Sequence, residues 1–446
     1  MGTARILYQY WQVRHGPATR LCSRAELEAW QERQVQAHLR RLLPRSAYTR
    51  QRLAGRPLAD WAQLPPMDKP EMLANFEALN TVGVTKEAAF ALALEAERTR
   101  DFTATLGDIT VGLSSGTSGT RGLFLASAAE RDQWAGAALA KVLPGGLFER
   151  QRVAFFLRAN SQIYRTVGSR WLRFEYFDLL RPLAEHLQRL NALQPTVLIG
   201  PPSLLRLLAE AAAWAGAGGR GRIAPRKVVS VAEVLDPLDA AYIEARFEQR
   251  VHQVYQCAEG FLGSTCRLGT LHLHEDLVVI QREWLDRAQR KFVPIVTDFH
   301  RASQPILRYR LDDILTERSQ PCACGSLLTA LETIEGRCDD LFYLPGLAGG
   351  WVPVFPDFVR RALLSASPEL TGYVARQLAP DQVEVALAAP AASRRAVEAA
   401  AARALAELWQ RAGVSPPRLS FVEGGQPGLN GRKFKRVERV MPKPSS

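Results

Sequence analysis

The segment 113–122 constrains this chain more than any other. It reads Leu-Ser-Ser-Gly-Thr-Ser-Gly-Thr-Arg-Gly, so every residue from Ser114 to Thr120 is a glycine or carries a hydroxyl. Mostly apolar residues at 109–113 and 123–126 flank it and predict strand, loop and strand. Glycines let a backbone approach a ligand closely and point several N–H groups at one anion, and hydroxyls add donors. The pattern therefore predicts a loop that binds a polyphosphate.

The loop is not a Walker A motif, because the Gly-Lys-Ser/Thr ending is missing and no helix pattern follows directly. An ordinary hairpin turn rich in serine, threonine and glycine is one alternative. The loop resembles the phosphate-binding motif of the adenylate-forming superfamily, which includes acyl- and aryl-coenzyme A ligases, peptide-synthetase adenylation domains and luciferases. Its Ser-Ser-Gly-Thr-Ser-Gly form is most similar to the phenylacetate–coenzyme A ligase branch.

This resemblance assigns phosphate binding to the loop residue by residue. The branch has Lys-Pro after the last glycine-threonine pair, where this chain has Arg121 and Gly122. The pyrophosphate contact normally made by the lysine would then pass to Arg121. The implied phosphate-binding residues are Ser114, Ser115, Gly116, Thr117, Ser118, Gly119, Thr120 and Arg121.

Composition narrows the class of protein further. The chain has 446 residues, of which 47% are hydrophobic, so it can form two or three domains. It contains no run of about 18 apolar residues and no signal-peptide pattern, so we expect a cytoplasmic protein without a membrane span. Much of its net charge of +12 comes from arginines spread along the chain, so we expect no nucleic-acid partner. A basic surface would attract an anionic partner, such as an acyl carrier protein or coenzyme A.

Alternating apolar strands and helical patterns predict an α/β fold. The expected buried strands are 153–157, 196–199 and 227–231, and the expected helices are 128–142, 179–193 and 204–213. Such alternation is typical of a parallel sheet with helices on both faces. Ligands bind at the C-terminal ends of these strands, where Gly200 and Glu233 lie.

Residues 251–260 resemble the family's Tyr-Gly-x-Thr/Ser-Glu segment, with Gln256 and Ala258 at two of its positions. The resemblance makes Glu259 the acid that binds the magnesium of ATP, and a carboxylate suits that hard cation. It places Tyr255 against the adenine. Glu233, in a looser match, would lie just before the adenine contact. An exposed glutamate at a strand end is the alternative for Glu259.

Two further motifs follow in the family's order. Residues 308–314 resemble Tyr-Arg-Thr-Gly-Asp, whose final aspartate holds both ribose hydroxyls, and that position is Asp313. A carboxylate is a sound acceptor for two neighbouring hydroxyls. Residues 335–341 resemble the hinge Gly-Arg-x-Asp-Asp, in which Arg337 approaches the ribose and Asp339 is the pivot.

The basic tail 431–437 resembles the branch's Gly-Lys-x-x-Arg segment, whose lysine enters the active site during adenylation. Spacing to Arg436 selects Lys433. Lys435 stays open as the alternative, because this tail carries one extra residue after the glycine. Without the other motifs, a solvated basic tail would be the simpler interpretation.

The six cysteines are too few for a disulfide framework in a chain of this size. Four residues suggest a metal site instead, because thiolates with an imidazole favour zinc. They are Cys266, His272, Cys322 and Cys324. Some members of the branch hold structural zinc with a similar set. Four reduced residues in a strand-and-turn subdomain are the alternative.

The ordered motifs cover nearly the whole chain, and the resemblance implies a two-domain α/β enzyme. A large adenylation domain, 1–335, would have parallel sheets flanked by helices and a β-rich subdomain, and would bind ATP and the acid. A small mobile α/β domain, 336–446, would act as a lid. A carboxylate would attack the α-phosphate of Mg-ATP, giving an acyl-adenylate and pyrophosphate. Rotation about Asp339 would then let a thiol attack the adenylate.

The acid and the acceptor stay open at this stage. Residues 156–164 depart from the glycine-rich aromatic stretch that lines the branch's aryl pocket, which argues against phenylacetate itself. Coenzyme A is the favoured acceptor. The alternatives are a carrier protein, an amine, adenylylation of a deazaflavin-type cofactor, and a non-catalytic nucleotide-binding partner in a biosynthetic complex. We also keep a homodimer open.

Overall fold

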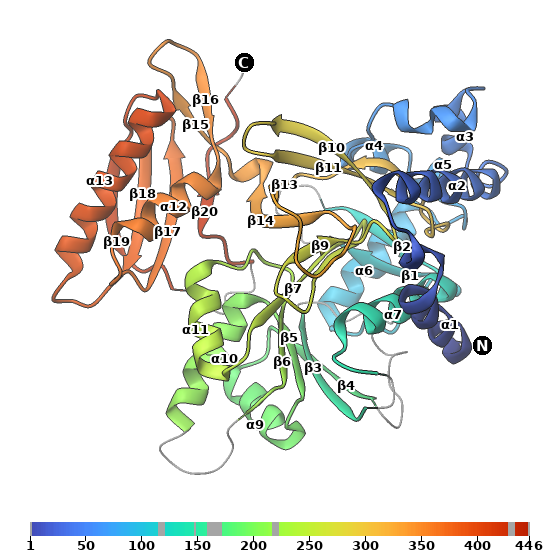
Figure 1. Cartoon of the computed structure of the whole chain (residues 1–446), viewed down its shortest axis with the longest axis horizontal. Coiled ribbons are helices and arrows are strands. Elements are labelled where there is room, and N and C mark those ends of the chain that lie inside the picture. Colours follow the sequence, from blue (N-terminus) through green and yellow to red (C-terminus); the bar gives the residue numbers. More distant parts are fainter. Residues whose placement is uncertain are drawn as a thin grey trace.

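The computed structural model describes residues 2–114, 121–146, 149–157, 172–215, 223–426 and 433–444. In Figure 1 the N-terminal helices lie at the right, a large sheet runs through the middle and a C-terminal unit lies at the left. Most of the predicted phosphate loop, residues 115–120, lies outside the described residues, as does most of the segment 156–164.

Helices form the N-terminal part of the chain. They are α1 (Gly2–His15), η1 (Pro17–Arg20), α2 (Arg24–Leu42), α3 (Ala47–Leu53), η2 (Leu58–Gln63), α4 (Lys69–Ala74), α5 (Phe76–Leu79) and α6 (Lys86–Thr99). Side-chain oxygens start several of them, because each accepts a backbone N–H that the first helical turn leaves without a partner. These caps are Ser23, Ser46, Asp68 and Thr85.

Twelve strands of the described residues form one mixed sheet, in the order β10-β11-β13-β14-β9-β8-β7-β6-β5-β3-β4, with β12 paired to β11. The parallel half contains β3 (Gln151–Leu157), β4 (Leu172–Asp178), β5 (Val197–Gly200), β6 (Lys227–Ser230) and β7 (Val251–Cys257). The antiparallel half contains β8 (Gly260–Thr265), β9 (Leu271–Leu273), β10 (Val279–Asp286), β11 (Lys291–Asp298), β12 (Ile306–Arg310), β13 (Asp313–Glu317) and β14 (Ala330–Arg337).

Strand β7 joins the two halves. It pairs in parallel with β6 and antiparallel with β8. The β-rich part therefore continues the parallel sheet edge to edge through backbone hydrogen bonds. The short turn between β7 and β8 carries Glu259, which places this side chain where the two halves meet.

Helices connect the parallel strands, as the alternating pattern predicts. The connecting helices are α9 (Leu183–Leu193), α10 (Pro202–Ala215) and α11 (Pro237–Phe247), and α7 (Ala128–Val142) leads into β3. The bounds of α7 match the prediction. Strand β4 is not predicted by the sequence, and α9 begins later than the helical pattern, with Pro182 as its N-cap. A proline disfavours the helical conformation of the residue before it, so the helix cannot extend back through Arg181 without strain.

The two strands predicted on either side of the glycine-rich segment are confirmed. Strands β1 (Thr110–Leu113) and β2 (Leu123–Ala126) pair antiparallel, with Leu113 opposite Leu123. This hairpin forms a two-stranded sheet of its own.

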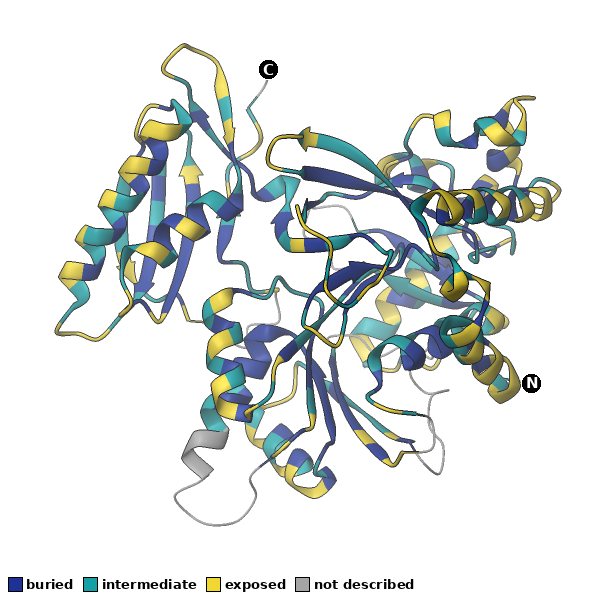
Figure 2. Ribbon diagram, viewed as in Figure 1, coloured by how far each residue is buried: buried dark blue, intermediate teal, exposed yellow. Residues whose placement is uncertain are grey.

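The C-terminal unit has its own sheet and core. Its sheet has the order β19-β18-β17-β20, formed by β17 (Gly372–Ala379), β18 (Gln382–Ala388), β19 (Arg418–Glu423) and β20 (Val437–Arg439). The remaining elements are η3 (Cys338–Asp340), the hairpin of β15 (Phe342–Pro345) with β16 (Trp351–Val354), and the helices α12 (Pro356–Ala366) and α13 (Arg394–Ala412). Buried residues of this core, such as Tyr373 and Trp409, come from this unit alone. Figure 2 shows the buried strands at the centre of both parts.

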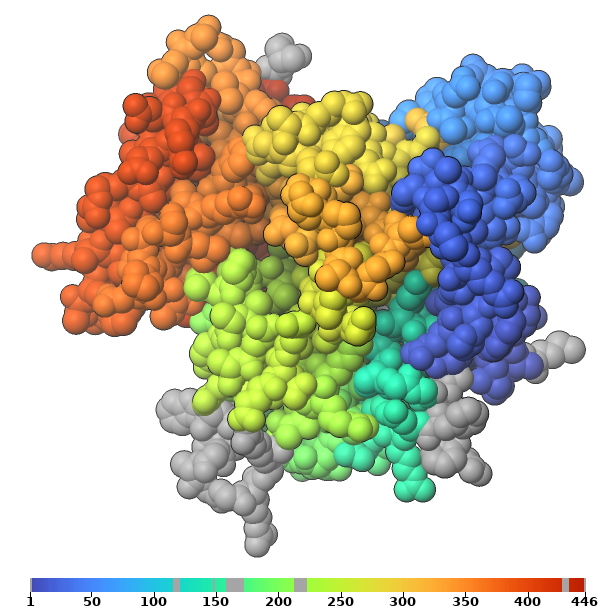
Figure 3. All heavy atoms as spheres, viewed as in Figure 1, coloured from blue at the N-terminus to red at the C-terminus, as the bar shows by residue number. Residues whose placement is uncertain are grey.

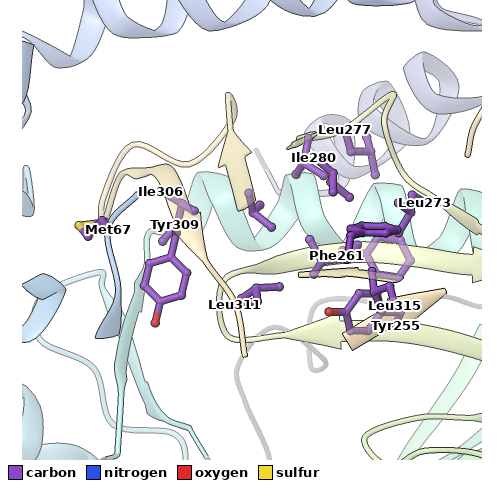
Figure 4. Packing of buried hydrophobic residues seen from close by; sticks show 14 of the residues in the cluster. Met67, Tyr255, Phe261, Leu273, Leu277, Ile280, Ile306, Tyr309, Leu311 and Leu315 are labelled. Atoms are coloured by element: carbon purple, nitrogen blue, oxygen red, sulfur yellow. The ribbon is translucent and has the colours of Figure 1, made fainter. Parts of the chain in front are cut away.

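A cluster of buried side chains holds the strands that meet at the middle of the sheet. Tyr255 of β7, Phe261 of β8 and Leu315 of β13 pack together in it (Figure 4). Tyr309 of β12 belongs to the same cluster and is 2% exposed. Packing of this kind fixes the end of β7 and the start of β13, where Glu259 and Asp313 lie. No helix among the described residues is long and apolar enough to cross a bilayer.

Candidate active site

One cavity of about 1220 Å³ collects most of the described residues that the sequence assigns to nucleotide binding and catalysis. It is bordered by the hairpin of β1 and β2, the C-terminal ends of parallel strands, the β7–β8 turn and the tail of the C-terminal unit. The predicted residues that line it are Ser114, Glu233, Tyr255, Glu259, Asp313, Arg337 and Lys433. Segments far apart in sequence therefore meet around one space, as a ligand site requires.

Hydrogen bonds close the base of the glycine-rich loop. The backbone N–H of Ser114 donates to the carbonyl of Gly122 (2.8 Å), and the N–H of Gly122 donates to Ser114 Oγ (2.7 Å). The hairpin therefore fixes where the loop leaves and rejoins the sheet. Of the predicted phosphate-binding residues, Ser114 and Arg121 are described, and the six between them lie outside the described residues.

Arg121 pairs with a carboxylate in this structure. Its Nη1 donates to Glu97 of α6 (2.8 Å), its Nη2 donates to the same carboxylate, and its Nε donates to the carbonyl of Ser114 (3.3 Å). Among the described residues, it does not line the cavity. Its assignment to pyrophosphate stays a prediction, and binding would require the guanidinium to leave Glu97.

Another cation, Lys69, lies at the base of the loop and does line the cavity. It is the first residue of α4. Its Cδ and Cε lie 3.6 Å from the place that a Cβ on Gly122 would occupy. The sequence analysis assigned no role to Lys69. Lys69 follows a leucine-proline pair in the segment before the glycine-rich loop, and that pattern could have identified it.

Three groups form the central polar part of the cavity. Glu259 is 9% exposed in the β7–β8 turn. The hydroxyl of Tyr255 donates to Asp313 Oδ2 (2.7 Å), at the start of β13. Burial, together with the charge of Asp313, raises the pKa of Tyr255 well above its ordinary value, so the hydroxyl keeps its proton. Asp313 is therefore held in place by one oxygen, and its other oxygen lies toward Arg337.

Arg337 lies beside this aspartate at the end of β14. Its Nε is 3.8 Å from Asp313 Oδ1, and its Nη2 donates to Asp312 Oδ2 (3.0 Å). The backbone N–H of Cys338 donates to the carbonyl of Asp312 (2.7 Å). These contacts tie the predicted ribose motif directly to the predicted hinge. Asp339 itself is in η3 and does not line the cavity.

Glu233 bridges the parallel half and the C-terminal tail. It follows Ala232, which has φ of 68°, an uncommon backbone conformation for a residue with a side chain. Its carboxylate accepts the backbone N–H of Ser203 (3.3 Å) at the start of α10 and that of Phe434 (3.0 Å). Burial raises the pKa of Glu233, although these N–H groups and Lys433 oppose the shift.

The two lysines of the tail have different surroundings. Both line the cavity, and Lys433 is the more exposed of the two. The surrounding protein lowers its pKa through desolvation, although Asp313 and Glu233 favour its charged form. Lys435 instead donates to Asp340 Oδ1 (2.7 Å), a carboxylate that is 5% exposed. The geometry thus places Lys433 among the cavity's carboxylates and engages Lys435 in an ion pair.

The four predicted metal ligands converge at one point of the antiparallel half. Their ligand atoms all lie within 4.8 Å of one another. Cys266 Sγ is 3.9 Å from Cys322 Sγ, and Cys324 Sγ is 3.4 Å from His272 Nε2. A tetrahedral zinc site with ordinary bond lengths has sulfur–sulfur distances of about 3.8 Å and sulfur–nitrogen distances of about 3.5 Å. The donor set therefore fits zinc.

The histidine of this cluster is oriented for binding. His272 Nδ1 is 3.0 Å from the carbonyl of Leu328, so Nδ1 must carry the proton and donate it. This leaves Nε2, which faces the cysteines, as a free lone pair. A histidine that binds a metal usually donates its other ring N–H in this way.

No family model and no curated protein matches this sequence. Solved structures do match. A crystal structure of 2-hydroxyisobutyryl-CoA ligase in the postadenylation state with 2-HIB-AMP is similar to this chain with a TM-score of 0.69 and 18% identity. The match covers 95% of this chain and 91% of that chain. An open conformation of that ligase with 2-HIB-AMP and CoA matches with a TM-score of 0.60 at 17% identity, over 94% of this chain and 92% of that one.

The same ligase in its thioesterification state matches with a TM-score of 0.56 at 18% identity, over 95% of this chain and 92% of that one. This chain therefore has the fold of the adenylate-forming ligases, C-terminal domain included. Coverage hardly differs among the three matches, and the TM-score is highest for the structure in the postadenylation state.

Proposed function

We propose that this chain is a ligase that adenylates a carboxylic acid with ATP and then transfers the acyl group to a thiol, with coenzyme A as the favoured acceptor. The observation that carries this proposal is the convergence of Glu259, Asp313 and Lys433 on one cavity at the base of the glycine-rich loop. The structurally similar 2-hydroxyisobutyryl-CoA ligase, crystallised with an acyl-adenylate and CoA, supports this class of reaction and acceptor.

The first half-reaction is a substitution at phosphorus. An oxygen of the substrate carboxylate attacks the α-phosphorus of ATP, the bond to the bridging oxygen breaks, and pyrophosphate leaves with that electron pair. Lys433 offsets the negative charge that develops, because its ammonium lies among the cavity's carboxylates. Lys69 supplies a second cation near the loop. In the second half-reaction, the thiol attacks the acyl carbon and AMP leaves.

The remaining roles concern binding. Glu259 offers a hard oxygen ligand for magnesium, which neutralises phosphate charge when bound. Asp313 accepts the ribose hydroxyls while Tyr255 fixes its orientation. The residues that the sequence assigns to the phosphates, 114–121, retain that role in this proposal. The domain boundary lies near residue 335, and Asp339 is the pivot.

The acid has an apolar part in this proposal. Apolar residues of α7 and of the parallel strands line part of the cavity, among them Trp134, Val142 and Phe174. Such a lining favours an apolar acyl or aryl group over a polar one.

Zinc at Cys266, His272, Cys322 and Cys324 would be structural, because four protein ligands leave no open position. The cytoplasmic location and the homodimer stay predictions.

Pyrophosphate exchange tests the proposal. The protein is incubated with Mg-ATP, labelled pyrophosphate and each member of a panel of apolar carboxylic acids. Exchange with at least one acid is expected in the wild type. Glu259→Gln should lose magnesium-dependent exchange while keeping its fold, because a neutral amide is a poor ligand for a hard cation. A wild type that exchanges with no acid, or a variant with normal exchange, would contradict the assignment.

A further inference from the structure

Five charged side chains are buried between the C-terminal unit and the helices α10 and α11. Figure 3 shows the two parts in contact along this side. Each of the five residues is 6% exposed or less, and they are Arg206, Asp236, Asp239, Arg360 and Arg436. Sequence reasoning used Arg436 only as a spacing marker and gave the other four no role.

Asp239, on α11, lies between two arginines that come from different parts of the chain. Arg436, in the C-terminal tail, donates from Nη2 to both carboxylate oxygens of Asp239 (2.6 Å each) and from Nε to Oδ2 (3.1 Å). Arg206, on α10, donates from Nη1 to Asp239 Oδ1 (2.7 Å). The carboxylate is therefore shared between the helices and the tail.

Asp236, the N-cap of α11, forms a second set of contacts across the same boundary. The hydroxyl of Tyr373, on β17, donates to Asp236 Oδ2 (2.6 Å). Arg360 Nε and Arg436 Nε each lie 3.6 Å from the same oxygen. Arg206 also reaches across, donating from Nη2 to the carbonyl of Thr371 (3.0 Å).

These contacts exist only while the C-terminal unit is seated on α10 and α11. A rotation of the unit would carry Arg360, Tyr373 and Arg436 away and expose both aspartates to water. A buried charge needs hydrogen-bonded partners, and Asp239 has them in Arg206 and Arg436, whereas Arg360 Nε makes no hydrogen bond among the described residues. The cluster therefore favours one arrangement of the two parts over others.

The seated tail also determines where Lys433 lies. Arg436 follows Lys433 by three residues, and the backbone N–H of Phe434 between them donates to Glu233. Arg436 further donates from Nη1 to the carbonyls of Tyr373 (2.9 Å) and Gly425 (3.3 Å), which ties the tail to its own unit. Moving Arg436 would therefore move Lys433 out of the cavity.

We propose that Asp239 and Asp236 form a latch that holds the C-terminal unit in the arrangement for adenylation and so positions Lys433. That this arrangement serves adenylation rests on the proposed function. That the two aspartates hold the C-terminal unit against α10 and α11 does not depend on it. Asp239 is a positioning residue, since it acts through Arg436.

Hydrogen exchange, resolved to single amides, tests the latch without requiring a substrate. Asp239→Asn removes the charge on α11 and leaves Arg206 beside Glu210. The amide of Phe434 should then exchange on the order of 10²-fold faster, the usual consequence of losing one partner of a buried, hydrogen-bonded charge pair. Amides of β18, inside the C-terminal unit, should be unchanged. Tyr373→Phe, which removes one hydroxyl, should give a smaller increase in the same direction.

Asp178→Asn is the matched control. Asp178 pairs with Arg100 at 2.7 Å, the same distance as Asp239 with Arg206, but both residues lie in the N-terminal part. Exchange at Phe434 should not change in this variant. Unchanged exchange at Phe434 in both Asp239→Asn and Tyr373→Phe would overturn the latch. So would equal acceleration at β18, which would mean that the unit unfolds rather than detaches.

Activity measurements separate this inference from the function on which it rests. With an acid identified by pyrophosphate exchange, Asp239→Asn should slow adenylation while transfer from a pre-made acyl-adenylate continues. Wild-type protein without exchange for any acid would refute the proposed function, and the amide result would still decide whether the two aspartates hold the unit. Active wild type with unaltered adenylation in Asp239→Asn would refute the positioning of Lys433 alone.

Discussion

Replacement of Lys433 by alanine tests which end of the tail does chemistry. Lys433 projects into the cavity among carboxylates, and its loss removes one cation from a site where negative charge develops. Removing one such donor usually slows the reaction by about 10²–10³-fold, or about 2.7–4 kcal/mol. A unit charge pair at about 4 Å with an effective dielectric constant of about 20 is worth a similar amount. The cavity walls desolvate Lys433, but the residue keeps an exposed surface, so stability should change by less than about 0.5 kcal/mol.

Lys435→Ala is the control, because it removes the same charge two residues away. Its partner Asp340 is 5% exposed and would keep its place without a counter-charge. We expect a stability loss of about 1–3 kcal/mol, the cost of an unmade charged hydrogen bond, with adenylation by the folded protein largely retained. Pyrophosphate exchange and thermal unfolding of both variants measure the two effects. If Lys435→Ala loses exchange and Lys433→Ala keeps it, the assignment is off by two residues. If both variants keep normal exchange, the tail is not part of the site.

Three other predictions concern the metal, the hinge and pH. Protein made without chelators should contain about one zinc per chain. Cys322→Ser should lose the zinc and lower the melting temperature, while the turnover of the protein that stays folded changes less. Metal analysis without zinc would refute the site. Asp339→Pro should keep adenylation and impair transfer of the acyl group, since a proline restricts the backbone rotation at the pivot, and unimpaired transfer would place the pivot elsewhere. Desolvation lowers the pKa of Lys433, so the adenylation rate should decrease at a lower pH than an ordinary lysine would give. Lys433→Arg should shift this alkaline decrease to higher pH. If the decrease does not shift, Lys433 is not its source.

Local patterns in the sequence predicted many of the elements. The helix 128–142 agrees with α7, and the strand 153–157 lies within β3, because hydrophobic periodicity and capping residues act over a few neighbouring positions. The strand, loop and strand around Ser114 were predicted for the same reason. Strand β4 was missed, although its first five residues alternate between apolar and charged side chains as a half-buried strand does.

Motif order in the sequence named Glu259, Asp313 and Lys433, which come from three distant segments, and the fold brings them to one cavity. Which charged group pairs with which was decided only by the tertiary structure. Arg121 could point at a phosphate or at Glu97, and the position of α6 selects Glu97. The choice between the two tail lysines likewise depends on where Asp340 lies.

The buried cluster around Asp239 has no signal in the sequence beyond the motif that contains Arg436. Two members lie in α11 or at its N-cap, one each in α10 and α12, and one in the tail, and nothing else in their local spacing distinguishes them from solvated surface residues. They acquire a role only because packing of the C-terminal unit excludes water from them, and an interaction between charges depends on that exclusion. The sequence determines which charged residue stands at each position. The low dielectric that couples these charges arises only when the two parts pack together in the fold.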